Sequence, residues 1–248
     1  MKQRIIQHGA TDSSSERAFA ALTEGSALNG DVHVAESQSA GRGRLGREWS
    51  SPPGGDLYAS VILLPQPPGW HPAGLTIAAG LGVLRGLERL GATKLSLKWP
   101  NDIIDSAGAK LAGVLIETRG LKEDAPHYVT GFGVNLSRTS FSPELVAERP
   151  VTSLALMGLE IDAESALAQI LPELDAAIQQ LEKSPNVLCS AFVERAGLYG
   201  REVELKNLEE TARGRLVDLN LETGISLISD DRARINIPLE HVSDLRSI

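Results

Sequence analysis

The sequence has little of several residue types, and each shortage excludes a class of protein. A single cysteine, Cys189, excludes an internal disulfide and a metal site built from several thiolates. Lys and Arg number 24 against 32 Asp and Glu, and the resulting net charge of −8 argues against broad, sequence-independent nucleic-acid binding. The longest mostly apolar stretch, residues 73–84, is too short to span a bilayer, and residues 1–8 lack the apolar core of a signal peptide. We therefore expect a soluble, cytoplasmic protein without membrane association.

Hydrophobic residues make up 42% of the 248 residues, enough for a full core, and their spacing predicts two kinds of structure. Helices are predicted at 72–90, where Gly82 and Gly86 indicate a close-packed face, and at 162–182, where Pro172 predicts a kink or a split. Apolar strands alternate with these helices in the first four fifths of the chain. Short alternating segments separated by turn residues then indicate a small antiparallel β unit. We predict an α+β chain with one domain at 1–199 and a second at 200–248.

The most informative segment is a basic loop that follows a predicted strand, Gly41-Arg-Gly-Arg-Leu-Gly-Arg-Glu-Trp49. Its glycines let backbone N–H groups approach an anion, and its arginines add forked donors for phosphate or carboxylate, so the loop is a candidate anion cradle. A solvated, flexible basic turn explains the pattern equally well. The Gly-x-Gly-x-x-Gly spacing formally matches a dinucleotide-binding fingerprint, but no predicted helix follows it, and we reject that interpretation.

Three later segments place polar groups at the ends of apolar strands. In Lys98-Trp-Pro-Asn-Asp102 a lysine lies on an apolar strand before a turn, and because an unpaired buried lysine is costly, a negative ligand is favoured. Lys110-Leu-Ala-Gly-Val-Leu-Ile-Glu117 is apolar on both faces, and Gly113 marks a close approach of a ligand or backbone. Gly131-Phe-Gly-Val-Asn-Leu136 carries an amide near its end. Taken singly, each segment also fits ordinary strand ends and sheet packing.

In this order and at these spacings, the four motifs resemble those of the catalytic domain of biotin protein ligases. Asp12-Ser-Ser-Ser15 stands where that family usually has Asp-Ser-Thr-Asn, so Ser15 replaces an asparagine. The resemblance implies a mixed central sheet flanked by helices, like that of class II aminoacyl-tRNA synthetases, with a small C-terminal SH3-like β-barrel. It implies a ligase that converts biotin and ATP to biotinyl-5′-AMP and then transfers biotin to a lysine of a biotin carboxyl carrier protein. Residues 1–199 would form the catalytic domain.

The resemblance also assigns roles to residues. Lys98 would bridge the biotin carboxylate and the α-phosphate, while Arg42 and Arg44 would hold carboxylate, phosphate or pyrophosphate; these three would be catalytic. Biotin would be bound by Ser13, Ser14, Gln38, Gly41, Arg42, Arg44, Lys98 and Gly113, and the nucleotide by Arg44, Trp49, Asn101, Lys110 and Asn135. Mg²⁺ would accompany ATP, with Asp102 as a nearby carboxylate but with no ligand assigned. Repulsion among the arginines predicts a loop at 41–47 that is mobile without ligand.

Partners and rivals follow from the same resemblance. The carrier would be that of acetyl-CoA carboxylase, and a homodimer through a sheet edge is a further expectation. Because the motifs begin by residue 12, we expect no N-terminal DNA-binding domain and no nucleic-acid partner. Two rivals stay open: a lipoate or octanoate protein ligase or transferase of the same fold, and a non-catalytic biotin-binding module. The set of cations favours an enzyme, since binding biotin alone needs no triphosphate site.

Overall fold

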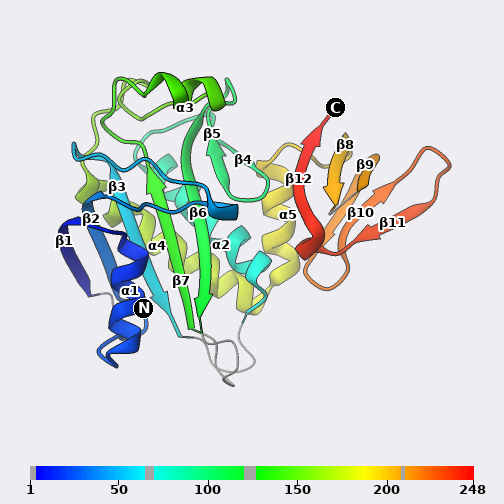
Figure 1. The fold of residues 1–248 in the computed structure, drawn as a ribbon. Coiled ribbons are helices and arrows are strands. Elements are labelled where there is room, and N and C mark those ends of the chain that lie inside the picture. The colour runs from blue at the N-terminus through cyan, green and yellow to red at the C-terminus, as the bar shows by residue number, and fades with distance from the viewer. Residues whose placement is uncertain (1–3, 65–69, 120–126, 208–209) are drawn as a thin grey trace.

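A computed structural model of the chain describes residues 4–64, 70–119, 127–207 and 210–248. Figure 1 shows a large sheet with its helices and, beside it, a smaller sheet formed by the C-terminal part of the chain. The strands and helices of these ranges, in chain order, are β1 (Ile5–Thr11), α1 (Ser14–Thr23), β2 (Val32–Gln38), the short 3-10 turn η1 (Arg44–Gly46), β3 (Leu57–Leu63), α2 (Pro72–Arg89), β4 (Ser96–Lys98), β5 (Asp102–Ile104), β6 (Lys110–Arg119), β7 (His127–Val134), α3 (Pro143–Glu148), α4 (Ala163–Lys183), α5 (Pro185–Arg195), β8 (Glu202–Asn207), β9 (Glu210–Asn220), β10 (Gly224–Ile228), β11 (Arg234–Ile237), η2 (Leu239–His241) and β12 (Val242–Ser247).

The large sheet is mixed, as predicted. Its strand order is β1-β2-β3-β7-β6-β5-β4, in which β1 and β2 are parallel and the other neighbours are antiparallel. Helix α1 covers one face through Ala18 and Phe19, which pack on Ile62 and Val129. Helices α2 and α4 cover the opposite face, where the main core lies (Figure 1). One face of the sheet therefore carries only α1, which leaves its remaining surface open to a ligand.

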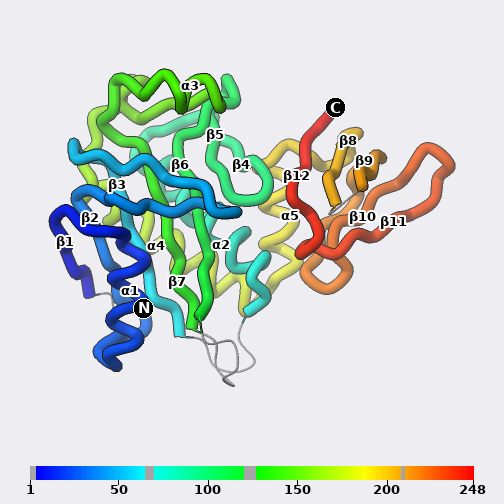
Figure 2. The backbone as a smooth tube through the Cα atoms, viewed as in Figure 1, coloured from blue at the N-terminus to red at the C-terminus, as the bar shows by residue number. Residues whose placement is uncertain are grey.

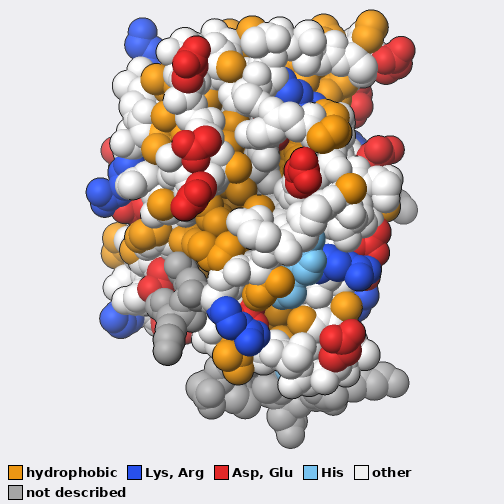
Figure 3. Space-filling model, turned by 90° about the vertical axis from the view of Figure 1, so that its left-hand side faces the viewer, with side chains coloured by type: hydrophobic (Ala, Val, Ile, Leu, Met, Phe, Trp, Pro, Cys, Tyr) orange, Lys and Arg blue, Asp and Glu red, His pale blue; other side chains and the backbone are white. Residues whose placement is uncertain are grey.

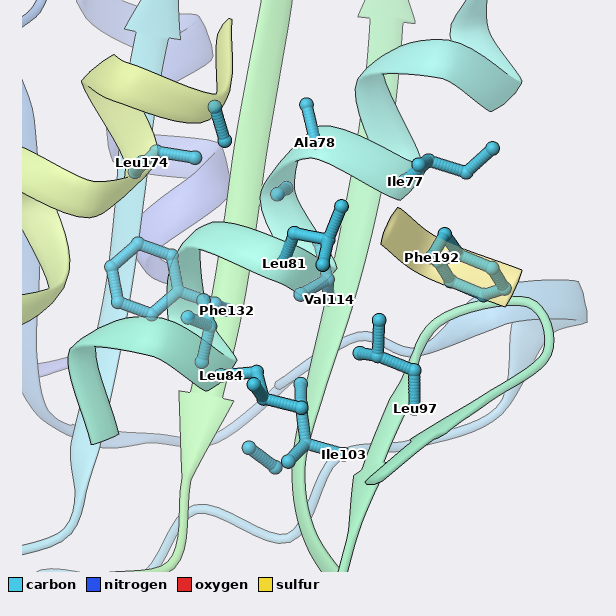
Figure 4. Packing of buried hydrophobic residues seen from close by; sticks show 14 of the residues in the cluster. Ile77, Ala78, Leu81, Leu84, Leu97, Ile103, Val114, Phe132, Leu174 and Phe192 are labelled. Carbon is cyan, nitrogen blue, oxygen red and sulfur yellow. The ribbon is translucent and has the colours of Figure 1, made fainter. Parts of the chain in front are cut away.

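The main core lies between α2, α4 and the sheet. Alternate apolar side chains of the strands, such as Val114 and Phe132, pack against residues of α2 such as Leu81 (Figure 4). The predicted close-packed face of α2 is confirmed, because a Cβ atom at Gly82 or Gly86 would lie 2.6 Å from a Cα atom of α4. Burial on this scale fixes the sheet as a rigid platform.

Several elements differ from the sequence predictions. Strands β1 and β5 and the final strand β12 were not anticipated, because short edge segments such as Ile5–Thr11 mix polar and apolar residues without a clear period. Helix α4 is not split, since Pro172 lies inside one continuous helix. The next helix begins at Pro185, because proline suits the first turn of a helix.

The second sheet is antiparallel, with the order β11-β10-β9-β8-β12. It joins the rest of the molecule around α5, where the rings of Trp99 and Phe192 meet edge to face at 5.8 Å. The indole Nε1 of Trp99 also donates a hydrogen bond of 3.2 Å to the backbone carbonyl of Val242. The aromatic residue of the Lys98–Asp102 motif therefore anchors the second sheet. None of the helices in the described ranges is long and apolar enough to cross a membrane.

Candidate active site

A cavity lies on the open face of the large sheet, beneath the loop that joins β2 to β3. Figure 2 shows this loop passing in front of β7 and β6, and the Trp49 ring of the loop lies against Gly133 of β7 and Gly113 of β6. The start of α1, β5 and the segment around α3 complete the walls. The predicted site residues that line this cavity are Ser13, Ser14, Gln38, Arg42, Arg44, Trp49, Asn101, Lys110, Gly113 and Asn135.

Two predicted site residues do not line the cavity. The Lys98 side chain is exposed, and the residue lies directly opposite Asp102 in the β4–β5 pair, so it stands at the rim of the cavity. Gly41 is buried, and a Cβ atom there would collide with the Trp49 carbonyl and come within 2.7 Å of the Ser51 hydroxyl. Its glycine is therefore required by the packing of the loop. The geometry gives no support to a bridging role for Lys98, which stays a prediction.

The cavity concentrates positive charge. Six cationic side chains line it against two acidic ones, Glu48 and Asp102. By contrast, acidic and basic side chains are interspersed over the molecular face in Figure 3, and the whole chain has a net charge of −8. Three of these cations are ion-paired with carboxylates outside the lining, so the charge that can attract a polyanion comes from the other three. The six cations are Arg42, Arg44, Arg47, Lys110, Arg138 and Arg149.

Lys110 is the lysine that lies inside the cavity. Its side chain is 13% exposed, its Nζ atom lies 2.6 Å from Asp102 Oδ1, and it stands 5.0 Å from the centre of the Trp49 ring. Burial lowers the pKa of Lys110, while the charge and hydrogen bond of Asp102 oppose this shift. Burial also lowers the pKa of Arg44. An incoming anion would therefore meet cations that have already lost much of their water.

Glycines form the floor of the cavity. A Cβ atom at Gly113 would lie 2.9 Å from the Trp49 ring and 3.1 Å from Lys110 Nζ, and one at Gly133 would collide with the same indole. The Trp49 Nε1 atom is buried and has no hydrogen-bond partner among the described residues. The predicted close approach at Gly113 is thus made by Trp49, whose flat ring lies against the sheet.

Hydroxyl groups form the other end of the cavity, at the start of α1. Gln38 Oε1 accepts the backbone N–H of Ser14 at 2.8 Å, and the Ser14 and Ser15 hydroxyls lie 2.8 Å and 3.0 Å from that of Ser60. Ser60 is fully buried on β3. Sequence reasoning missed it, because one serine in an apolar strand carries no pattern. Ser15 therefore lines the cavity as part of a hydroxyl cluster with Ser14 and Ser60.

Amide side chains secure the strand ends around the site. Asn101 Nδ2 donates to the Val114 carbonyl at 2.5 Å, and Asn135 Nδ2 donates to the Thr152 carbonyl at 2.9 Å. Arg138, another residue that the sequence did not predict, is ion-paired with the buried Asp56 and donates to the Ser50 carbonyl at 2.5 Å. Because Arg138 lies 82 residues from Asp56 and 88 residues from Ser50 in the chain, no local motif could reveal these contacts.

The arrangement is suited to bringing anions together. Cations, neutral hydroxyl groups and amide groups line the same cavity, and a flat aromatic ring lies on its glycine floor. None of the five histidines lines the cavity, so no base-activated protein nucleophile is indicated there. The described residues hold no group of three or more His, Cys, Asp or Glu that could bind a metal ion.

Comparisons with known proteins agree with this geometry. A model of the Biotin/lipoate A/B protein ligase family matches residues 9–135. The bifunctional ligase/repressor BirA of Escherichia coli is 38% identical over 160 residues, which are 64% of this chain and 49% of that protein, so the chain spans about half the length of this relative. The biotin–[acetyl-CoA-carboxylase] ligase of Paracoccus denitrificans is 35% identical over 238 residues, 94% of this chain and 97% of that protein.

A solved structure matches the whole chain. It is the biotin protein ligase of Aquifex aeolicus in complex with biotin and ATP, with a TM-score of 0.81, 29% sequence identity and coverage of 100% of both chains. The family match and the Paracoccus relative each extend over at least half of the present chain. The chain therefore belongs to the biotin/lipoate A/B protein ligase family, and within it is similar to the biotin protein ligases.

Proposed function

We propose that the protein is a biotin–[biotin carboxyl-carrier protein] ligase. The observation that carries this proposal is the convergence of Arg44 and Lys110 in one cavity with the glycine floor and the hydroxyl end. Two negatively charged reactants repel each other, and a cavity with fixed cations offsets that repulsion while it orients the reacting atoms. The names of the relatives favour biotin over lipoate as the acid.

In the first step, a carboxylate oxygen of biotin attacks the α-phosphorus of ATP. The bond between that phosphorus and the bridging oxygen breaks, and pyrophosphate leaves with the electron pair. Lys110, whose side chain is 13% exposed, would stabilise the charge that builds on the α-phosphate and carboxylate. Arg44 would hold the phosphate chain, and Trp49 would form the wall beside the nucleotide. Lys98, at the rim, would lie closer to pyrophosphate.

In the second step, the uncharged amine of a carrier lysine attacks the carbonyl of biotinyl-5′-AMP. AMP leaves, and the amine loses its proton to solvent or to a carboxylate at the cavity. The hydroxyl end would bind the ureido head of biotin through Ser13, Ser14 and Gln38, which leaves the carboxylate facing the cations. Mg²⁺ would neutralise the triphosphate and be held chiefly by phosphate oxygens, with Asp102 nearby.

Further expectations belong to the same proposal. We infer that residues 1–199 form the catalytic domain and that the second sheet, within 200–248, is an SH3-like barrel. A cytoplasmic location, the acetyl-CoA carboxylase carrier as partner, a homodimer through the sheet edge and the lack of a nucleic-acid partner also stay predictions.

The experiment is a transfer assay with two competing acids. The protein is incubated with Mg·ATP, a carrier domain, and labelled biotin or labelled lipoate. The proposal predicts that label from biotin enters the carrier and that a carrier whose acceptor lysine is replaced by arginine stays unlabelled. Labelling from lipoate alone would favour the rival ligase, and biotin binding without ATP-dependent labelling would favour the non-catalytic module.

A further inference from the structure

The two arginines at the start of the basic loop have different surroundings. The Arg42 guanidinium is ion-paired with Glu16 through Nη1 and lies 2.9 Å from Glu117 Oε2 through Nη2. The Arg44 side chain has no hydrogen bond or ion pair with any described residue, although it lines the same cavity. One arginine is therefore already neutralised by the protein, and the other is available to an anion.

The carboxylates that hold Arg42 come from two different elements. Glu16 lies in the first turn of α1, and Glu117 lies on β6. Glu16 also accepts a hydrogen bond of 2.5 Å from Arg119, whose guanidinium lies 4.0 Å from the centre of the Phe19 ring. The charges of two carboxylates and two guanidinium groups therefore cancel within this group, which consists of Glu16, Glu117, Arg42 and Arg119. An anion that sought Arg42 would have to compete with two carboxylates at contact distance.

Arg42 lies at the base of a small hairpin made by the loop. Gly43 N–H donates to the Arg47 carbonyl at 2.7 Å, Trp49 N–H donates to the Gly41 carbonyl at 3.0 Å, and Arg42 forms a bridge with Glu48. The tip, which includes Arg44, carries Leu45 with a φ of 57° and a side chain 79% exposed. The base of the hairpin is thus fixed to α1 and β6, while its tip extends away from those contacts.

We propose that Glu16 and Glu117 are positioning residues that hold Arg42 as a strut, so that Arg44 and Lys110 bind the reacting anions. This inference rests on the proposed function and replaces the equal roles that the sequence suggested for Arg42 and Arg44. The strut holds the base of the loop over the sheet before any substrate arrives. The mobility predicted for the loop is then confined to its tip.

The test uses Glu16→Gln and Glu117→Gln, which keep side-chain size but remove the charge. The matched control is Glu204→Gln, because Glu204 also pairs with two arginines, Arg213 and Arg246, but lies in the second sheet. If the strut positions the loop, kcat/KM for biotin in adenylate formation falls about 10- to 100-fold in both site variants. The control keeps the wild-type value, and all three variants have similar melting temperatures.

A rise in kcat/KM for biotin in the glutamate variants would overturn the inference. If Arg42 instead binds substrate anions directly, removing a competing carboxylate frees it, and KM falls or stays unchanged. In that case Arg42→Gln would lower kcat/KM for biotin far more than either glutamate variant. If Arg42 is a strut, the double variant Arg42→Gln, Glu117→Gln should have the same kcat/KM as Arg42→Gln alone.

A second readout does not depend on activity. Trypsin cleaves after arginine, so the rate of cleavage after Arg44 and Arg47 in the ligand-free protein reports opening of the loop. The strut predicts several-fold faster cleavage at these two sites in Glu16→Gln and Glu117→Gln but not in Glu204→Gln. Unchanged cleavage in an active enzyme would refute the strut and leave the ligase proposal standing. Faster cleavage of the glutamate variants, in a protein that is inactive with biotin, would support the strut and refute the ligase proposal.

Discussion

Lys110 offers the sharpest quantitative test of the site, because the chain supplies its own control. Replacing Lys110 by methionine removes a charge whose side chain is 13% exposed, while Lys98→Met removes one at the rim. At an effective dielectric constant near 20, two unit charges about 4 Å apart interact by about 4 kcal/mol. Asp102 at 2.6 Å offsets part of this attraction in the ground state. Loss of one preorganised donor to a developing charge costs about 2.7–4 kcal/mol, or 10²- to 10³-fold in kcat.

The assay is single-turnover release of pyrophosphate from ATP with saturating biotin. We expect Lys110→Met to slow it by about 10²- to 10³-fold and Lys98→Met to change it by less than about tenfold. Since Lys110→Met also leaves Asp102 without its partner, Asp102→Asn and the double variant separate the two effects. Full activity of Lys110→Met, or a greater loss in Lys98→Met, would show that the bridging charge comes from the rim, as the sequence motif suggested.

Three further outcomes follow from the structure. Gly113→Ala should lower kcat/KM for ATP, because the new methyl group meets Trp49 and Lys110 Nζ. The control Gly9→Ala should leave kcat/KM unchanged, because no atom lies within 4 Å of the added methyl group. Equal effects of the two substitutions would contradict the role of the glycine floor. Burial, together with the neighbouring His8, lowers the pKa of His33 to about 4. Because the unfolded chain takes up that proton first, the free energy of unfolding should fall by up to about 3 kcal/mol as pH drops from 7 to 4. Urea denaturation between pH 7 and pH 4 should show this fall in the free energy of unfolding, and the fall should be smaller in His33→Gln. An equal dependence on pH in the two proteins would refute the role of His33. Burial raises the pKa of Cys189 to about 12, so a thiol reagent at pH 8 should label it only after unfolding, and rapid labelling of the native protein would contradict its place in the core.

The fold was predictable where the sequence carries a clear period. The glycines of the helix at 72–90 indicated a close helix contact, and that contact is present. Strands β1 and β5 were not predictable, because they owe their structure to pairing with other strands rather than to a local pattern. Pro172 does not split α4, since packing of α4 on α2 outweighs the lost hydrogen bond.

The site was predictable in its motifs but not in its division of labour. Two of the four segments pointed to anions, and the structure brings Arg42, Arg44 and Lys110 together. Which lysine enters the cavity depends on strand register, and no spacing in the sequence reveals that Lys98 faces solvent. The partners of Arg42 are 26 and 75 residues away along the chain, so its neutralisation is visible only in three dimensions.

The central claim is that fixed cations let a carboxylate meet the α-phosphate of ATP in this cavity. Biotin-dependent exchange of labelled pyrophosphate into ATP, with no carrier protein present, measures that step alone. The account predicts exchange that requires biotin and Mg²⁺ and that nearly vanishes in Lys110→Met. Exchange that proceeds equally without biotin would contradict this claim. The absence of exchange in a folded protein that binds both biotin and ATP would also contradict it.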